Sequence, residues 1–287
     1  MNFLKTFESE FNSKLSEQQQ NKENQNETGG ESVPQHMTNF FEYVRNELRK
    51  KSIVVFSNQE NETMLCRYKG DKEKMNWTDN LVRSARSLVF DNETHETLMV
   101  SPVKSILIDE FKTAHPNVAE VIVEDFPSGP MVNLYYHPRK GWQISTRSYV
   151  DGNNTFRSGE KTFRQLFEEA LKKTTGLTID EFGANLDPDN TFSFVVTHPG
   201  YFDVARYAEP SFVLVEVRIR TQDHMLVANE PVEDYFKSKD WNIKFPKRYP
   251  LGTWDEVDPF LRRNRHKNKV RFFVLVMNVL KSVILII

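Results

Sequence analysis

The segment Val121–Ser148 constrains the fold more than any other part of this 287-residue chain. Two apolar runs within it, Met131–Tyr136 and Trp142–Thr146, are joined by a short connection that contains Pro138 and Gly141. Period-two alternation on both sides of a connection rich in turn residues predicts an antiparallel β-hairpin.

A change of chain direction is expected just before this hairpin, at Ser128, Gly129 and Pro130. Glycine tolerates a positive φ that other residues rarely adopt, and proline fixes its own φ. We therefore expect Gly129 to lie in a turn at the edge of a sheet.

Composition places the chain among globular proteins, since 38% of its residues are hydrophobic and 27% are charged. Its length allows one large domain or two small ones. A net charge of −2 argues against a surface that coats nucleic acid, although it leaves room for a local basic groove. The single cysteine, Cys66, excludes an internal disulfide and a cysteine-rich zinc site. With no secretory signal ahead of its Asn-x-Thr triplets, the chain is expected to be cytoplasmic.

Residues 1–36 are expected to form an amphipathic helix followed by a disordered linker. Apolar residues that include Phe7 and Phe11 recur at helical spacing within Met1–Leu15. Ser16–Gln35 is polar and cannot bury enough apolar surface to offset its ordering entropy. The helix is interpreted as a piece that binds a partner or docks onto its own chain, with a frayed extension as the alternative. We expect deletion of both segments to change the melting behaviour little.

Residues 37–254 are expected to form the folded domain. A helix after Thr38 and a second one within residues 158–176, capped by Ser158 and ended by Gly176, frame a series of strands. Thr178 and Glu181 fit a capping box for a further short helix. The strands follow one another without a βαβ alternation, so the fold class is α+β with an antiparallel sheet around a groove. The expected strands outside the hairpin are Ile53–Phe56, Thr63–Tyr68, the end of Leu81–Asp91, Thr97–Val100, Thr191–Thr197 and Ser211–Thr221.

The tail, residues 255–287, changes from basic to apolar. Arg262–Arg271 is dense in basic residues, and Phe272–Ile287 is almost wholly apolar apart from Asn278 and Lys281. A membrane-spanning helix needs about 20 apolar residues, so the run is short for that role. Three interpretations are open: a membrane anchor with a basic flank, a buried strand, or an end altered by truncation or a frame shift. We favour the last.

Three stretches of the chain are informative about function through their order and spacing rather than singly. They are Arg83–Asp91, then the block around Gly129 with Ser145–Ser148, and then Phe192–Arg220. In order and spacing this series resembles the nucleotidyltransferase domain of the phage-type RNA ligase 1 family, over roughly residues 37–254. Ser101–Phe111 also lies where that family places a lysine before its nucleophile.

The resemblance implies a defined chemistry and defined cofactors. A lysine amine attacks the α-phosphate of ATP and expels pyrophosphate, which leaves a lysyl-adenylate. Mg²⁺ and cationic side chains neutralise the developing phosphate charge, and carboxylates hold the metal. The AMP then passes to an RNA 5′-phosphate, which a 3′-hydroxyl attacks.

This sequence departs from the family pattern at the chemical positions. With Gly129 placed on the family's glycine, Phe126 stands where the nucleophilic lysine belongs, and Ser128 stands where a carboxylate belongs. Val195 occupies the position of a glutamate. Phenylalanine cannot form a phosphoramidate and valine cannot hold a metal, so the resemblance implies a pseudoenzyme without a catalytic set.

Five residues keep the character that nucleotide or RNA binding requires. The resemblance implies that phosphates are contacted by cationic and hydroxyl side chains, while the glycine lets the backbone approach the nucleotide. For each of the charged residues, an ordinary surface role is the alternative. The predicted binding residues are Arg86, Lys104, Gly129, Thr146 and Arg147.

The remaining chemistry-bearing residues are expected to be structural. His198 is interpreted as the cap of a strand end before Pro199. Asp109 and Glu110 are expected to point to opposite faces of a strand and so not to bind a metal. Aromatic residues of the hairpin are expected in the core rather than against bases; they are Tyr135, Tyr136 and Trp142.

Three functions therefore compete. The first is a catalytically weakened ligase-fold protein that binds ATP or RNA ends, and the second is a working RNA ligase that uses a displaced lysine such as Lys104 or Lys140. The third is a non-enzymatic interaction protein, joined to a partner through Met1–Leu15 or to a membrane through Phe272–Ile287. Covalent labelling by ATP separates the second from the others, and salt-sensitive RNA binding separates the first from the third.

Overall fold

The central hairpin forms as its sequence predicts. Strand β6 (Met131–His137) pairs with β7 (Gly141–Ser145) in antiparallel register. The connecting turn ends at Gly141, whose φ of +71° lies in the left-handed region that favours glycine. The computed structural model of the protein describes residues 7–17, 40–69, 75–114, 116–117, 121–156, 159–201, 206–221, 225–227, 233, 236, 239–265, 272–277 and 284–286.

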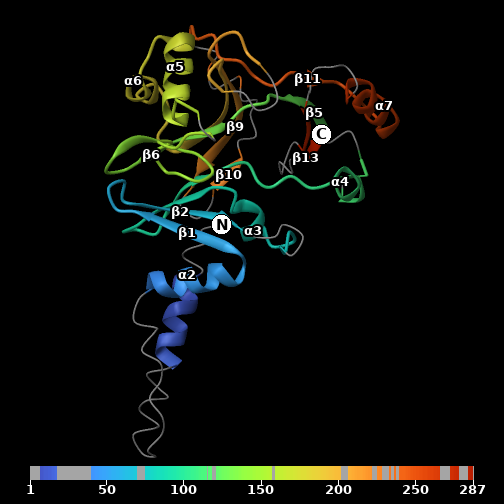
Figure 1. Cartoon of the computed structure of the whole chain (residues 1–287). Coiled ribbons are helices and arrows are strands. Elements are labelled where there is room, and N and C mark those ends of the chain that lie inside the picture. The colour runs from blue at the N-terminus through green and yellow to red at the C-terminus, as the bar shows by residue number, and fades with distance from the viewer. Residues whose placement is uncertain are drawn as a thin grey trace, which may run out of the picture.

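Within these residues the named strands form three sheets, all with antiparallel pairing, and helices cover their outer faces (Figure 1). The hairpin belongs to a five-stranded sheet with the order β10-β9-β8-β6-β7, completed by β8 (Asn190–Thr197), β9 (Ser211–Arg220) and β10 (Met225–Val227). This arrangement confirms the α+β class with antiparallel sheets.

Two helices pack on one face of the five-stranded sheet, α5 (Phe163–Thr175) and α6 (Ile179–Gly183). Phe167 of α5 is fully buried, with its ring centroid 5.5 Å from that of Phe194 and 5.9 Å from that of Phe212. Side chains of β6 that point to this face, Val132 and Leu134, complete the cluster.

Local signals set the ends of these helices. The Thr178–Glu181 capping box begins α6 as predicted, and Gly176 ends α5 with a φ of +77°. The predicted cap Ser158 lies outside the described residues. The N-cap of α5 is instead Thr162, which forms a capping box with Gln165, so the helix begins four residues later than predicted from Ser158.

A second sheet, with the order β1-β2-β3-β4, lies against the hairpin. Its strands are β1 (Ile53–Asn58), β2 (Thr63–Tyr68), β3 (Leu88–Asp91) and β4 (Thr97–Val100). The face toward the hairpin forms a buried cluster of Leu65, Val89, Leu98 and Met99 with Tyr135 and Val150. The opposite face packs against α2 (Phe40–Lys50) and α3 (Asn80–Ser84).

A third sheet, with the order β11-β5-β12-β13, brings the tail back onto the chain. Strand β12 (Phe272–Met277) pairs along all six residues of β5 (Val121–Phe126), and β11 (Arg248–Tyr249) and β13 (Ile284–Ile286) flank this pair. The structure therefore gives the tail two strands, Phe272–Met277 and Ile284–Ile286, as the strand interpretation expects.

Helices α4 (Ile108–Ala114) and α7 (Trp254–Arg265) accompany this third sheet and share a small core with it. Asp109 and Glu110 lie in the first turn of α4, so the expectation that they belong to a strand was wrong. In the part of the chain that the structure describes, no helix is long and apolar enough to cross a membrane.

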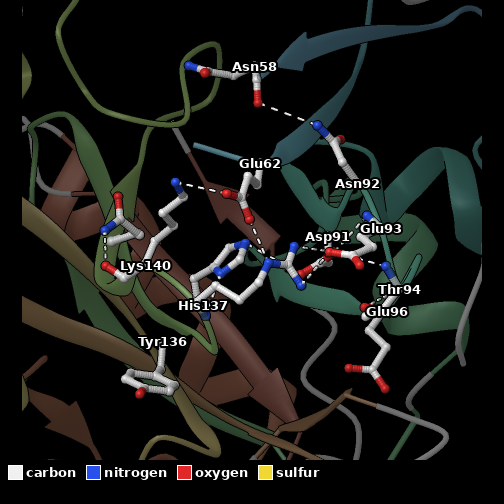
Figure 2. A network of polar contacts seen from close by, with 12 residues as sticks. Asn58, Glu62, Asp91, Asn92, Glu93, Thr94, Glu96, Tyr136, His137 and Lys140 are labelled. Atoms are coloured by element: carbon white, nitrogen blue, oxygen red, sulfur yellow. Dashed lines mark hydrogen bonds and ion pairs between the residues drawn. The ribbon is translucent and has the colours of Figure 1, made fainter. Parts of the chain in front are cut away.

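An ion-pair network fixes the turn of the hairpin to the second sheet (Figure 2). The Arg139 guanidinium donates to Asp91 at 3.0 Å and also pairs with Glu62, while the Lys140 amine lies 2.9 Å from Glu62. His137 is fully buried, and its Nε2 lies 3.4 Å from Asp91 Oδ2. The network thus anchors the end of the hairpin that is farthest from Gly129.

The charge of buried Asp91 is held by several donors. Burial alone acts to raise the pKa of this carboxyl, but the N–H of Thr94, the Arg139 guanidinium and the N–H of Glu93 together keep the pKa below its usual range. The two N–H groups belong to the turn between β3 and β4 and lie 2.9 Å and 2.7 Å from Oδ1. Asp91 is therefore a structural carboxylate.

Residues 7–17 form a helix that packs against α2 (Figure 1). Phe7 and Phe11 keep only 7% and 8% of their surface exposed. The ring centroid of Phe11 lies 5.6 Å from that of Phe40 and 5.3 Å from that of Tyr43. Of the two roles considered for this helix, the structure shows docking onto its own chain, so a deletion that includes it would remove buried aromatic contacts.

The buried ring of Phe11 leads to a test of stability. Phe11→Ala should lower the free energy of unfolding by about 3 kcal/mol, near the low end of values for large-to-small core changes, because a terminal helix can relax around the change. Asn12→Ala, at the exposed neighbouring position, is the matched control and should have little effect. Equal melting curves for both variants in urea or on heating would mean that the helix is not docked in solution.

Candidate functional site

A cavity of about 490 Å³ opens between the hairpin and the second sheet. Its lining comes from segments far apart in the sequence: the loop before β3, the end of β4, the start of β6, the chain after β7, and α5. The described lining residues are Arg86, Ser87, Ser101, Pro130, Met131, Asn133, Thr146, Arg147, Ser148, Asn154, Phe156, Phe163 and Tyr201.

Two arginines give this cavity its charge. Arg86 comes from the loop between α3 and β3, and Arg147 comes from the chain just after β7. The Arg147 guanidinium carbon lies 4.8 Å from the ring centroid of Tyr68. No ion pair or side-chain hydrogen bond joins either guanidinium to another side chain in the described part of the chain.

The electrostatic setting of Arg86 is that of a cation without a counter-ion. Burial lowers the pKa of its guanidinium, Tyr68 opposes this, the nearby charge of Arg147 lowers the pKa further, and Glu216 has a smaller opposing effect. Glu216 itself is buried and accepts a hydrogen bond from Arg218 Nε at 2.6 Å. Its charge is therefore already matched by another arginine, and the cavity favours an incoming anion.

One hydroxyl in the wall also lacks a partner. Ser101 is 2% exposed, and its Oγ has no hydrogen bond within the described structure. The neighbouring hydroxyls are satisfied: Ser87 Oγ donates to the Thr146 carbonyl at 3.0 Å, and Thr146 Oγ1 lies 3.3 Å from Asn154 Oδ1. A buried unpaired hydroxyl costs free energy, and a bound ligand that accepts from Ser101 would recover it.

A row of polar side chains that includes the lining residue Asn133 crosses the five-stranded sheet. Register places Asn133 of β6 opposite Ser145 of β7 on one side and Ser193 of β8 on the other, and Ser193 opposite Glu216 of β9. Asn133 Nδ2 donates to Ser145 Oγ at 3.3 Å, and Ser193 Oγ donates to Asn133 Oδ1 at 3.0 Å. The sequence indicates this row only indirectly, because Asn133 and Ser193 are single polar residues within apolar strands.

The remaining wall is aromatic. The ring centroid of Tyr201 lies 4.8 Å from that of Phe156 and 6.2 Å from that of Phe163. All three rings line the cavity. A site with cations and hydroxyls on one side and rings on the other suits a ligand that has both a phosphate and a flat apolar part.

The structure brings together three of the five predicted binding residues. Arg86, Thr146 and Arg147 line the cavity, and Gly129 directly precedes its lining residue Pro130. Lys104 is not among the described lining residues. Its amine donates to the Ser105 carbonyl at 2.7 Å and lies 5.4 Å from the ring centroid of Trp77.

Gly129 is needed for a close approach of two backbones. A Cβ atom at this position would lie 1.9 Å from the Val196 carbonyl oxygen. Its φ is not in the left-handed region, so the reason given from the sequence was wrong although the residue matters. The adjacent Pro130 carbonyl accepts from the Val196 N–H at 2.9 Å, which holds the start of β6 along β8.

The positions expected for lost catalytic groups lie near this approach. The Ser128 carbonyl accepts from the Tyr207 hydroxyl at 2.8 Å. Val195 is fully buried and pairs with the lining residue Met131. Phe126 ends β5, and its side chain lies outside the described structure.

Residues expected to be structural occupy structural places. His198 Nδ1 accepts from the Gly200 N–H at 2.8 Å, so Nε2 carries the proton that it shares with Glu169 at 2.9 Å. Tyr135 is fully buried, and the rings of Tyr136 and Trp142 meet edge to face with centroids 5.6 Å apart. These contacts agree with a strand-end cap and a hairpin core.

The described residues offer an anion site more readily than a metal site. Asp, Glu, His and Cys do not occur among the described lining residues. In the described part of the chain, no group of three or more such residues lies in a position to hold a metal ion. The described cavity residues therefore suit an anion, and they include no carboxylate to hold Mg²⁺.

Comparison with known proteins identifies the fold. Neither family models nor curated proteins match the sequence. Among solved structures, an archaeal ATP-dependent RNA ligase is similar with a TM-score of 0.52 and 13% sequence identity, over 85% of this chain and 60% of that one. A putative ATP-dependent DNA ligase from Aquifex aeolicus gives a TM-score of 0.52 and 11% identity, over 85% of this chain and 62% of that one.

These likenesses define a ligase-like nucleotidyltransferase fold. The chain spans less than two thirds of the length of these ligases. At such low identity the shared property is the fold alone.

The close approach at Gly129 can be tested by adding one methyl group. Gly129→Ala should lower the free energy of unfolding by about 1–3 kcal/mol, the range for overpacking, because backbone rather than a flexible side chain stands in the way. Gly252→Ala is the control, since its added Cβ would meet only the Glu256 carboxylate at 3.5 Å. Chemical denaturation of both variants measures the difference. A Gly129→Ala variant as stable as the control would show that the approach is looser in solution.

Proposed function

We propose that this protein binds a nucleotide or the 5′-phosphate end of an RNA in the cavity of its ligase-like domain, without forming a covalent adenylate. The observation that carries the proposal is the pair Arg86 and Arg147, which line the cavity with no carboxylate partner among the described residues. Two cations held close together favour a ligand with concentrated negative charge, as a phosphate has.

The unpaired hydroxyl and the rings extend this argument. Ser101 can donate to a phosphate oxygen or a sugar hydroxyl, and the rings of Phe156 and Tyr201 give a flat surface for a base. We also propose that the chain is related to the phage-type RNA ligase 1 family and that it lacks the family's catalytic residues. It rests on the order of the sequence motifs and on the shared fold.

A covalent step lacks its nucleophile in the cavity. The described lining includes no lysine. Of the displaced candidates, Lys140 pairs with Glu62 at the far end of the hairpin (Figure 2), and Lys104 bonds to the Ser105 carbonyl. An amine must reach near-attack distance of the α-phosphate to act, and neither side chain lines the space that would hold it.

The first test concerns binding. Arg86→Ala and Arg147→Ala should each weaken binding of AMP or of a 5′-phosphorylated oligoribonucleotide by about 1–3 kcal/mol, the range for losing a charge-assisted contact. Arg49→Ala, at an exposed position on α2, is the matched control for loss of one positive charge. Calorimetry at several salt concentrations should also show affinity falling as salt rises. If neither cavity variant changes binding, the interaction-protein alternative is preferred.

The second test concerns chemistry. After incubation with α-labelled ATP and Mg²⁺, denaturing electrophoresis should show no labelled protein, because the cavity offers no amine to form the phosphoramidate. An active ATP-dependent ligase treated in parallel shows that the label and conditions work. A labelled band that disappears in Lys104→Ala or Lys140→Ala would instead establish a working ligase with a displaced lysine.

A further inference from the structure

A basic and aromatic strip continues from the cavity onto the surface. We propose that a single-stranded RNA chain runs out of the cavity along this strip, formed by Phe56, Arg67 and Tyr149, so that the protein holds several nucleotides beyond the bound end. The inference deepens the proposed function and rests on it.

Phe56 and Arg67 come from neighbouring strands and share one face. Arg67 of β2 is paired with Val54 of β1, two residues before Phe56, so the two side chains are diagonal neighbours on the same side of the sheet. The Arg67 guanidinium carbon lies 5.1 Å from the ring centroid of Phe56. This cation–π contact orients the guanidinium while 42% of the Phe56 surface stays exposed.

The packing of Val150 places its neighbour Tyr149 near Phe56 and Arg67. Val150 is buried in the cluster that contains Leu65, and Leu65 is the register partner of Phe56. Tyr149 directly precedes Val150 and is 53% exposed, and it lies close enough to Arg67 to raise the pKa of that guanidinium. Among the large hydrophobic side chains that the structure describes, the only exposed ones are these two rings and Leu107.

Arg67 joins this strip to the cavity through Arg147. The Arg147 guanidinium carbon lies 4.8 Å from the ring centroid of Tyr68, the residue that follows Arg67. Burial lowers the pKa of the Arg67 guanidinium, and the charge of Arg147 lowers it further. Arg67 Nε is buried and has no hydrogen-bond partner in the described structure. Arg86, Arg147 and Arg67 thus form a series of cations without a carboxylate partner among the described residues.

Repelling cations next to exposed rings match the chemistry of a single strand. Phosphates of the strand would neutralise the arginines, and its unpaired bases would stack on the two rings. A duplex keeps its bases stacked inside, and an acidic peptide has no bases for the rings to bind. If the cavity binds the 5′-phosphate end of an RNA, the strip that begins at Arg147 is placed to bind the nucleotides that follow this phosphate.

The experiment compares a mononucleotide with a strand in the full-length protein. AMP and a 5′-phosphorylated 12-nucleotide single-stranded RNA are titrated against wild type, Phe56→Leu, Tyr149→Leu and Arg67→Gln. Each ring variant should weaken RNA binding by about tenfold, since stacking of one base on an aromatic ring is worth that much, and should leave AMP binding unchanged. Arg67→Gln should also weaken RNA binding, Arg67→Lys should restore part of it, and Arg49→Gln is the control for charge loss.

The outcomes separate this inference from the proposed function. If AMP and RNA bind but Phe56→Leu, Tyr149→Leu and Arg67→Gln all hold the RNA as tightly as wild type, the strip is not its path and the cavity proposal stands. If neither AMP nor RNA binds wild type, both proposals fail. Equal losses for a single-stranded DNA of the same sequence would overturn the assignment to RNA, and equal losses for duplex RNA would overturn base stacking.

Discussion

Strand β6 is the constraint on which the rest of the fold depends, because its two faces serve different cores. Val132 and Leu134 point to the core under α5, whereas Asn133 and Tyr135 point to the second sheet. A slip of one residue in its register would exchange these faces and place Asn133 in an apolar core. The turn network at Arg139 and the close approach at Gly129 fix β6 at both of its ends, which keeps the cavity side in place.

The parts that sequence predicted well are those set by local chemistry. Examples are the hairpin, the capping box at Thr178 and the left-handed glycine at the end of α5. Each depends on residues that are near one another in the chain, so a short stretch of sequence is enough to predict it. The strand in the tail could not be chosen from local sequence, because it forms by pairing with β5, about 150 residues earlier in the chain. The true N-cap, Thr162, competed with another hydroxyl residue four positions away.

The candidate site shows the same division. Arg86, Thr146 and Arg147 were found because the order of motifs places them on a known scaffold. Ser101 and the aromatic wall were missed, since each comes from a separate segment and only tertiary packing makes them neighbours. An unpaired hydroxyl has no sequence signature at all, because being unpaired is a property of its surroundings rather than of the residue.

The surroundings of β8 also limit which side chains this part of the fold can hold. Ser193 and Val195 lie on the side of the strand that faces away from the α5 core, but their surroundings differ. A glutamate in place of Val195 would be fully buried beside Gly129. Burying a charge that has no partner costs free energy. A carboxylate at position 193 would join the polar row beside Asn133, but it would stand opposite the buried carboxylate of Glu216, and like charges directly opposite each other in a sheet are destabilising. Position 193 therefore suits the neutral hydroxyl that it carries, which donates to Asn133 Oδ1 at 3.0 Å while Glu216 pairs with Arg218.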